Sequence, residues 1–400
     1  MDSEPGHLLV VDDNEMNRDL LSRRLRRKGH RVEVADGGAA ALEMIGTESF
    51  DLVLLDIMMP GMDGMEVLER IRVDHGSDEL PVIMATAKTE SEDIVAALKI
   101  GASDYVTKPF DFPVVLARVQ TQLAVKKSRD ALARAHCRMK KDLEAAARIQ
   151  QTLLPSQEID IPGVRCAWRY VPCDELAGDT LNIVPLGVGI TGLYVLDVSG
   201  HGVPSSLLSV ILSRLMTGVP DASSVLRTLR DGSGSCEISI ATPAEVAREL
   251  SRRFPYNKET FQYFTMVYAV LDIKRRLFSY VSAGHTPIFH LRRGSAPVLH
   301  TSTGSPIGLV PAELAPSEYE EITIALEPGD RLYLLSDGIP EAHVPDGEEY
   351  GEERISRALQ GCFDDDLDAS ITHLLDDVWD WMGGTGPGDD VSVLAVEIEE

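Results

Sequence analysis

The chain has 400 residues, 44% of them apolar, which is enough for two or three domains that each bury a core. Its net charge of −26 repels nucleic acid, so a DNA-binding output is not expected. It has no apolar run of membrane-spanning length, no signal-peptide pattern at its start and no Cys-x-x-Cys pair among its five cysteines. These features predict a cytoplasmic protein without a membrane span, a zinc site or a disulfide framework.

The N-terminal region contains four short apolar runs, each followed by a charged or hydroxyl side chain. The runs and the groups that follow them are Leu8–Val11 with Asp12 and Asp13, Leu52–Leu55 with Asp56, Val82–Ala85 with Thr86, and Tyr105–Thr107 with Lys108. Their alternation with amphipathic segments predicts a doubly wound parallel sheet flanked by helices. Because functional groups collect at the carboxyl ends of such strands, we expect a phosphoryl-transfer site there. The acid pair would bind Mg²⁺, Asp56 would be the nucleophile, and Lys108 and Thr86 would meet the new charge.

Residues 5–125 resemble the CheY-like receiver domains of two-component response regulators. The resemblance rests on these side chains and on two segments, Met58–Gly64 (Met-Met-Pro-Gly-Met-Asp-Gly) and Gly101–Phe110 (Gly-Ala-Ser-Asp-Tyr-Val-Thr-Lys-Pro-Phe). It implies that Asp56 accepts a phosphoryl group from a sensor histidine kinase and that Asp12, Asp13 and Asp56 bind Mg²⁺. It also implies that the switch and signalling residues are Thr86, Tyr105 and Lys108. We further expect a cis Lys108–Pro109 bond, because proline makes that isomer cheap.

A helical connector is predicted over residues 126–154. Residues 113–154 contain no glycine and no proline after the first position, and a stripe of side chains recurs at spacings of three and four: Leu132, Ala135, Met139, Leu143, Ala146, Ile149 and Leu153. The stripe favours a parallel, coiled-coil-like helix pair in a homodimer, although its alanines make it weak. The alternative is a single helix packed on its own C-terminal domain. Pro155 is expected to end the helix.

Residues 155–400 contain four acidic motifs at the ends of predicted strands, each next to glycine or a small residue. They are Gly178-Asp179, Asp197–Gly202 (Asp-Val-Ser-Gly-His-Gly), Ser336–Gly338 (Ser-Asp-Gly) and Gly388–Asp390 (Gly-Asp-Asp). Carboxylates that converge from several strand ends suit hard divalent cations. Two such cations would hold and deprotonate a water for attack on a phosphoester.

These motifs resemble the SpoIIE/RsbU-like branch of the metal-dependent (PPM, protein phosphatase 2C-like) serine/threonine phosphatases. Segments 149–155, 282–287 and 304–309 add to the resemblance. It implies an αββα sandwich and two Mn²⁺ or Mg²⁺ ions bound by Asp179, Asp197, the carbonyl of Val198, Asp337 and Asp389, with Asp390 and His201 as further candidates. Asn182 stands where the family often has a second acid, which leaves a third, weaker metal site open.

The remaining elements of this region are predicted from local pattern. Strands are expected at residues 192–198, 264–273, 277–283, 287–292, 331–335 and 391–398, helices at 204–216 and 243–254, and a surface loop at 221–240. We interpret His201 as shaping the turn before a helix and His285 as capping a strand pair, rather than as general acids.

The acidic charge is concentrated near the C-terminus. Residues 312–400 include 25 acidic and 3 basic side chains and so account for −22 of the net charge. The favoured interpretation is a solvated surface, and a specific basic partner is the alternative.

The two resemblances together predict a response regulator whose output is a phosphoserine/phosphothreonine phosphatase. The SpoIIE/RsbU resemblance implies a phosphorylated anti-sigma-factor antagonist, a STAS-domain protein, as the substrate. The alternative is a non-catalytic adaptor whose C-terminal domain binds a regulatory partner when the receiver is phosphorylated. The full set of carboxylates favours the enzyme. The sequence leaves open whether phosphorylation of Asp56 activates or inhibits.

Overall fold

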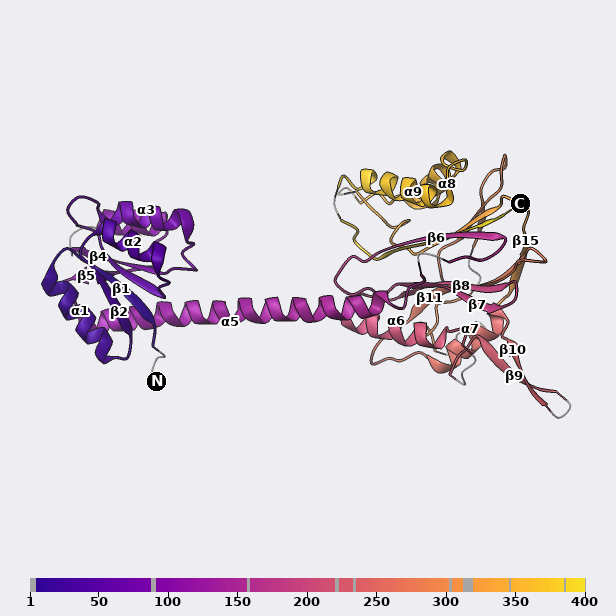
Figure 1. Ribbon diagram of the computed structural model, residues 1–400, viewed down its shortest axis with the longest axis horizontal. Coiled ribbons are helices and arrows are strands. Elements are labelled where there is room, and N and C mark those ends of the chain that lie inside the picture. Colours follow the sequence, from indigo (N-terminus) through magenta and orange to yellow (C-terminus); the bar gives the residue numbers. More distant parts are fainter. Residues whose placement is uncertain are drawn as a thin grey trace. The chain divides into compact units, whose positions relative to one another are not determined.

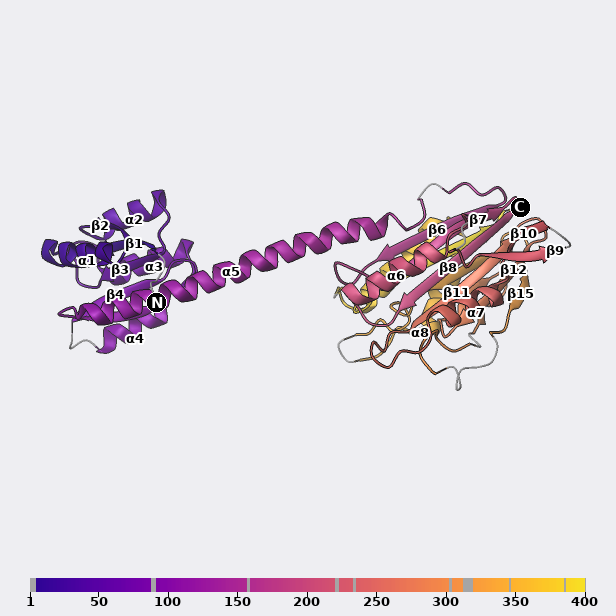
Figure 2. The same cartoon turned by 90° about the horizontal axis from the view of Figure 1, so that it is seen from below.

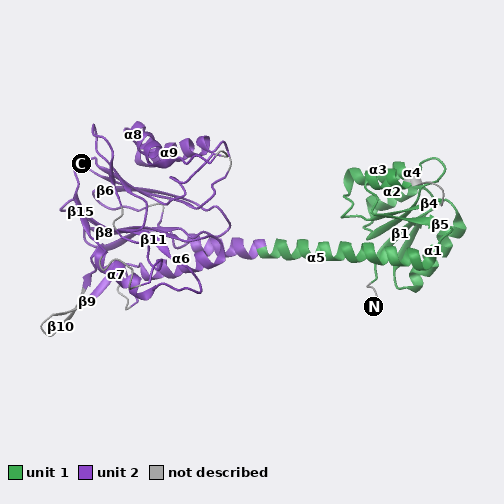
Figure 3. Cartoon of the chain, turned by 180° about the vertical axis from the view of Figure 1, so that it is seen from behind, with its two compact units in different colours: residues 1–139 green, residues 140–400 purple. Residues whose placement is uncertain are grey.

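The computed structural model describes residues 5–87, 91–156, 159–219, 223–232, 235–301, 304–311, 319–344, 347–384 and 386–399. The chain divides into two compact units, Met1–Met139 and Lys140–Glu400 (Figure 3). None of the described helices is both long enough and apolar enough to cross a membrane.

The first unit is a parallel five-stranded sheet of order β2-β1-β3-β4-β5, as the sequence predicts. Its strands are β1 (His7–Val11), β2 (Arg31–Ala35), β3 (Leu52–Asp56), β4 (Val82–Ala87) and β5 (Asp104–Lys108). Its helices are α1 (Glu15–Arg27), α2 (Gly38–Thr47), α3 (Gly64–Asp74), α4 (Ser91–Ile100) and the start of α5 (Phe112–Gln151). Helices α1 and α5 cover one face, and α2, α3 and α4 cover the other, which makes the sheet doubly wound.

Helix α5 ends at Gln151, three residues before the predicted end at Leu154. The amide of Thr152 donates to the carbonyl of Ile149, and that of Leu153 donates to Gln150, so the last turn tightens before Pro155. Part of the predicted stripe is exposed: Leu132, Met139 and Ile149 are 70%, 56% and 67% exposed, whereas Leu143 and Ala146 are half-buried.

The second unit is an αββα sandwich, in agreement with the prediction (Figures 1 and 2). One sheet has the order β15-β12-β11-β8-β7, with strands β7 (Thr180–Gly187), β8 (Ile190–Val198), β11 (Phe264–Asp272), β12 (Leu277–Ala283) and β15 (Ile322–Ala325). The other has the order β14-β13-β16-β17-β6, with strands β6 (Val164–Val171), β13 (Ile288–Leu291), β14 (Val298–His300), β16 (Arg331–Leu335) and β17 (Val391–Ile398).

Helices cover the outer face of each sheet. The first sheet packs on α6 (Val203–Leu215) and α7 (Pro243–Arg253), and the second packs on α8 (Gly351–Gly361) and α9 (Leu367–Trp381) (Figure 1). Between the sheets lies an apolar core to which both contribute, including Leu193 and Val267 from the first and Leu334 and Leu394 from the second.

The predicted surface loop over residues 221–240 is wrong in part. Most of it forms an antiparallel hairpin of β9 (Arg227–Gly232) and β10 (Ser235–Ile240), which extends from the sandwich in Figure 1. Residues 220–222 and 233–234 lie outside the described part of the chain. Glycine and serine are common in hairpin turns as well as in loops, so their presence did not distinguish the two.

Candidate functional sites

An acidic site lies at the carboxyl edge of the first unit's sheet. Strands β1 and β3 are parallel neighbours, so Asp12, which follows β1, and Asp56, which ends β3, lie at the same edge. Both are buried, at 1% and 3% exposure. Lys108 ends β5, and its Nζ is 2.9 Å from Oδ2 of Asp12 and 2.6 Å from Oδ2 of Asp56. Ligand atoms of Asp12, Asp13 and Asp56 lie within 4.8 Å of one another, which suits one divalent cation.

Lys108 supplies this site with positive charge. Burial raises the pKa of Asp56, and the hydrogen bond from Lys108 opposes the shift. Burial works to lower the pKa of Lys108, but the two carboxylates outweigh it and raise that pKa. The site also requires a glycine, because a Cβ on Gly64 would come within 2.1 Å of the Asp56 carbonyl oxygen.

The predicted switch residues lie on β4, which is next to β3, and on β5, which is next to β4. Thr86 is 1% exposed on β4, and its hydroxyl donates to the carbonyl of Ala87 at 3.3 Å. Tyr105 is half-buried on β5, and the guanidinium of Arg118 lies 5.2 Å from the centre of its ring. The Lys108–Pro109 bond is cis, as predicted.

The four acidic motifs of the second unit come from both sheets. Asp179 precedes β7, Asp197 lies in β8, Asp337 follows β16 and Asp389 precedes β17. These carboxylates perturb one another, and among the described residues none of the four pairs with a lysine or an arginine. Among the described residues, the cluster therefore differs from the acidic site of the first unit in having no lysine or arginine paired with its carboxylates.

Most carboxylates of this cluster are withdrawn from solvent: Asp179 is buried, Asp197 and Asp337 are half-buried, and Asp389 is exposed. Burial raises the pKa of Asp197 to about 8, and repulsion from Asp337 and Asp389 adds to the shift. Burial and then Asp389 raise the pKa of Asp337 to about 6. Burial and then Asp197 raise that of Asp179 well above its usual value. Ionising all of them at neutral pH is costly unless a cation is bound.

One carboxylate of the cluster has an oxygen suited to a divalent cation. Asp179 is 2% exposed, and its Oδ2 has no hydrogen-bond partner among the described residues. A buried, unpartnered carboxylate oxygen is a suitable cation ligand. The compact groups in the described part of the second unit are Cys173, Asp389 and Asp390, and Cys362, Asp365 and His373. Of the predicted ligands, these groups contain Asp389 alone.

Asp390 holds the loop that carries Asp179. Its Oδ1 accepts from the amide of Cys173 at 2.9 Å, and its Oδ2 accepts from the amide of Gly178 at 2.7 Å. Of the acid pair, Asp390 is 4% exposed, whereas Asp389 is exposed and its Oδ1 accepts from the amide of Asp390 at 2.7 Å. The backbone of Asp390 also packs closely against Gly338, since a Cβ there would come within 2.1 Å of the Asp390 carbonyl oxygen.

Thr265 was not found by sequence reasoning, because no motif surrounds it. It pairs with Asp197 across β11 and β8, and its Oγ1 is 3.5 Å from Oδ2 of Asp197. The same hydroxyl lies 2.6 Å from Nδ1 of His285, whose pKa burial lowers to about 4. His285 is therefore neutral near pH 7 and ties the end of β12 to β11, which agrees with its predicted structural role.

His201 lies in the turn directly before Gly202, the residue that caps α6, and no side-chain hydrogen bond caps that end. The imidazole of His201 is instead 74% exposed, with Nδ1 3.1 Å from Oδ2 of Asp174.

Gln150, on the last turn of α5, is a second residue that sequence reasoning missed. It is 7% exposed, and its Nε2 donates to the carbonyl of Ala177 at 2.7 Å and to Oγ of Ser209, on α6, at 2.9 Å. Ala177 lies two residues before Asp179. Asn182, on β7, donates to the carbonyl of Leu153 at 2.9 Å. The end of the connector is thus bonded to both sides of Asp179.

Comparisons with known proteins agree with this geometry. The family model for stage II sporulation protein E (SpoIIE) matches residues 188–399, and the model for the response regulator receiver domain matches residues 8–120. The chain therefore belongs to the SpoIIE family, and its C-terminal domain is of the metal-dependent serine/threonine phosphatase class. Its N-terminal unit is a receiver domain.

Individual proteins match one unit each. An uncharacterized transcriptional regulatory protein, YkoG, of Bacillus subtilis (strain 168) is 41% identical over 120 residues, which are 30% of this chain and 52% of that protein. The chain thus spans about half the length of this curated relative. The SiaA-PP2C domain of Pseudomonas aeruginosa has a similar fold, with a TM-score of 0.53 and 18% identity over 66% of this chain and 99% of that one.

Proposed function

We propose that this protein is a phosphatase that hydrolyses phosphoserine or phosphothreonine on a protein substrate and is controlled by phosphorylation of Asp56. The observation that carries the proposal is the partly buried acidic cluster, in which Asp197 and Asp337 have raised pKa values and no lysine or arginine partner among the described residues. An adaptor would gain nothing from burying such a cluster, since it costs folding free energy.

Two Mn²⁺ or Mg²⁺ ions would be held by Asp179, Asp197, the carbonyl of Val198, Asp337 and Asp389. A bound divalent cation lowers the pKa of its water and stabilises charge on phosphoryl oxygens. The chain's own contribution is to hold the ligands in place. Thr265 lies against Asp197, and Asp390 fixes the loop before Asp179. We assign Asp390 this positioning role, with Asp389 as the ligand of the pair.

The receiver would take its phosphoryl group from a sensor histidine kinase. Asp56 would be the nucleophile, and Mg²⁺ would bind Asp12, Asp13 and the acceptor. Lys108 already lies 2.6 Å from Oδ2 of Asp56, so it is placed to stabilise the phosphorylated carboxylate. Thr86 and Tyr105 would carry the change to the outer surface of the domain.

Helix α5 would transmit the signal. Its last turn contacts the backbone at Ala177 through Gln150 and receives a hydrogen bond from Asn182 at Leu153. A shift of this turn would move the segment that carries Asp179, and coupling requires such an element with two arrangements. The exposed stripe on α5 supports a homodimer in which two copies of the helix pair, since Leu132 and Met139 are more than half exposed.

The substrate class follows from the family. We infer a phosphorylated anti-sigma-factor antagonist, a STAS-domain protein, whose dephosphorylated form would bind an anti-sigma kinase. This substrate class can be tested by incubating the protein with phosphorylated STAS proteins, in the presence and absence of a phospho-Asp56 mimic.

The basal phosphatase activity is tested with p-nitrophenyl phosphate. We expect hydrolysis with Mn²⁺ and none after chelation, because the cluster needs external positive charge. Equal rates with and without chelator would contradict the metal dependence. If none of the phosphorylated compounds tested is hydrolysed in the presence of Mn²⁺, the non-catalytic adaptor would be favoured.

A further inference from the structure

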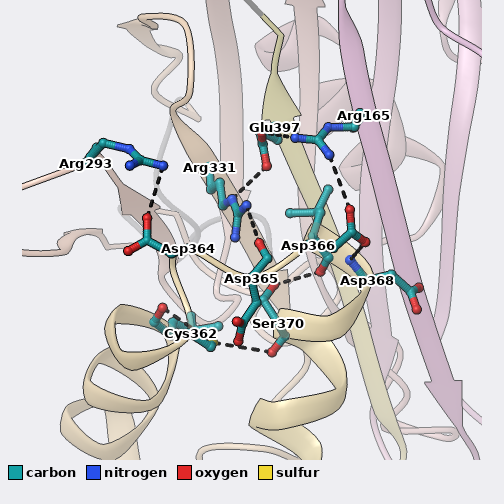
Figure 4. A network of polar contacts seen from close by, with 12 residues as sticks. Arg165, Arg293, Arg331, Cys362, Asp364, Asp365, Asp366, Asp368, Ser370 and Glu397 are labelled. Carbon is teal, nitrogen blue, oxygen red and sulfur yellow. Dashed lines mark hydrogen bonds and ion pairs between the residues drawn. The ribbon is translucent and has the colours of Figure 1, made fainter.

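Part of the acidic surface near the C-terminus is neutralised within the chain. At the turn between α8 and α9, Arg293 pairs with Asp364 at 3.1 Å and Arg165 pairs with Asp366 at 3.3 Å (Figure 4). Arg331 lies between them in Figure 4 and donates to the carbonyl of the intervening residue at 2.7 Å. These acids hold the corner together and leave little negative charge for a partner.

A second set of acids has no such compensation. A cavity of about 590 Å³ opens beside Asp337, and we call it the glutamate groove after four of its lining residues: Glu341, Glu349, Glu352 and Glu353. All four side chains are exposed, and none pairs with a lysine or an arginine in the described part of the chain. The arginine of the lining, Arg354, pairs with Glu348 at 2.6 Å and lies 3.9 Å from the ring of Trp381, so its charge is already engaged.

The groove is continuous with the proposed metal centre. Its lining includes Asp337, Thr265 and His285. His285 is only 5% exposed, and its Nε2 has no hydrogen-bond partner among the described residues. A buried polar atom without a partner, in the wall of a cavity, is a feature of a surface built to receive a polar ligand.

We propose that the glutamate groove selects phosphoprotein substrates that carry basic side chains beside the phosphorylated residue. The inference rests on the proposed phosphatase function. A phosphoryl group is itself an anion, so four uncompensated glutamates repel it on approach. Arginine or lysine next to the phosphorylated residue would pair with the glutamates and offset that repulsion. Acidic flanking residues would add to it.

The preference should apply to one flank of the phosphorylated residue. A second cavity, of about 440 Å³, is lined by Asp389, Gly338 and His343 and shares Glu341 with the groove. The lining of the glutamate groove includes Glu349, Glu352 and Glu353, and the lining of the second cavity does not. A peptide that lies across the metal centre would therefore meet most of the negative charge on one side.

The test compares synthetic phosphoserine peptides that differ in having arginines or glutamates before or after the phosphoserine. The variant is the double substitution Glu352→Gln/Glu353→Gln, at exposed positions in the first turn of α8. The matched control is Asp376→Asn/Asp380→Asn, which makes the same charge change on exposed positions of α9 outside the groove lining. The small substrate p-nitrophenyl phosphate, which has no flanking residues, reports the basal activity of each protein.

For the wild type at low salt we expect kcat/KM to favour the arginine peptide by roughly tenfold on one flank, because two or more close charge pairs are involved. The ratio should fall to about twofold in the glutamine variant and with added salt, and should persist in the control. Equal rates for all peptides in the wild type, or an unchanged ratio in the glutamine variant, would overturn the groove inference alone. Failure to hydrolyse p-nitrophenyl phosphate with Mn²⁺ would overturn the proposed function and the inference with it.

Discussion

The two acidic sites of this chain differ in the source of their positive charge. In the receiver, Lys108 lies within 3 Å of carboxylate oxygens of both Asp12 and Asp56. In the sandwich, Asp197 and Asp337 have no cationic partner among the described residues, and burial raises their pKa values to about 8 and about 6.

This difference indicates what each site needs in order to work. The negative charge of the receiver's carboxylates is partly neutralised by Lys108, so the receiver fold should tolerate the loss of metal. The sandwich buries carboxylates that repel one another, and an unpaired buried charge costs several kcal/mol. Its ionised state therefore depends on bound cations, and the predictions below separate the two cases.

The largest expected effect is at the metal centre. Asp197→Asn and Asp337→Asn should each lower Mn²⁺-dependent phosphatase activity by roughly a hundredfold to a thousandfold or more, since each removes charge that activates the attacking water. Acetyl phosphate should still label the receiver of both variants. Initial rates and labelling are measured on the same preparations, and rates within a few-fold of wild type in both variants would refute the metal assignment.

A loss of phosphorylation is expected when Asp56, the proposed acceptor, is replaced. Asp56→Asn should abolish acid-labile labelling by acetyl phosphate, because the amide is not a nucleophile for phosphoryl transfer. Hydrolysis of p-nitrophenyl phosphate by the unphosphorylated protein should be unchanged. Phosphate incorporation and hydrolysis rate are the two readouts, and a variant that is labelled as well as wild type would show that another residue is the acceptor.

The pH dependence of stability should distinguish the two sites. The folded pKa values of Asp197 and Asp337 lie above the unfolded value of about 4, so the folded state retains protons that the unfolded state has lost. Without metal, the sandwich should therefore lose stability as pH rises from about 4 to about 8, by on the order of a few kcal/mol. Below pH 4 both states are protonated and this cost is absent.

Urea unfolding followed by tryptophan fluorescence measures this effect selectively, because all three tryptophans of the chain lie in the second unit. Added Mn²⁺ should remove most of the pH dependence, and Asp337→Asn should flatten it without metal. A metal-free midpoint that rises steadily from pH 5 to pH 8 would contradict the account.

A smaller effect is expected at the end of α5. Gln150→Ala should remove the hydrogen bonds from Gln150 to the Ala177 carbonyl and the Ser209 hydroxyl, at a cost of about 1–3 kcal/mol. Phosphatase activity should fall several-fold because the loop before Asp179 is held less firmly. The control is Gln151→Ala, at an exposed neighbouring position. A higher apparent Mn²⁺ requirement in Gln150→Ala and not in the control would support the positioning role, and equal behaviour of the two would contradict it.

The sequence predicts the functional groups best where strand ends carry them. Asp12, Asp56 and Lys108 follow successive apolar runs, and a parallel sheet brings such ends to one edge. The same logic locates Asp197 and Asp337 at strand ends, with the αββα layers supplied by the family resemblance. Local pattern is sufficient here because the chemistry coincides with the end of each element.

The site residues that could not be identified from the sequence depend on contacts between distant segments. Thr265 faces Asp197 only because of the register between β11 and β8, and Gln150 reaches Ala177 only through the docking of α5. In both cases, the deciding interaction joins residues whose proximity no short motif encodes. Strand β7 is absent from the strands expected from local pattern; it contains Pro185, which its position at the edge of the sheet tolerates.

The most direct test of the central claim is the response of phosphatase rate to a phosphate mimic on the receiver. Phosphate release from a phosphoprotein substrate is measured with and without beryllofluoride, in the wild type, Asp56→Asn and Met139→Pro. The proline should cost about 3 kcal/mol or more of helix stability and so interrupt α5 while sparing both sites. The account predicts a clear change in rate in the wild type and none in either variant. An unchanged wild-type rate, or a Met139→Pro protein that responds as the wild type does, would contradict control of the phosphatase through the connector.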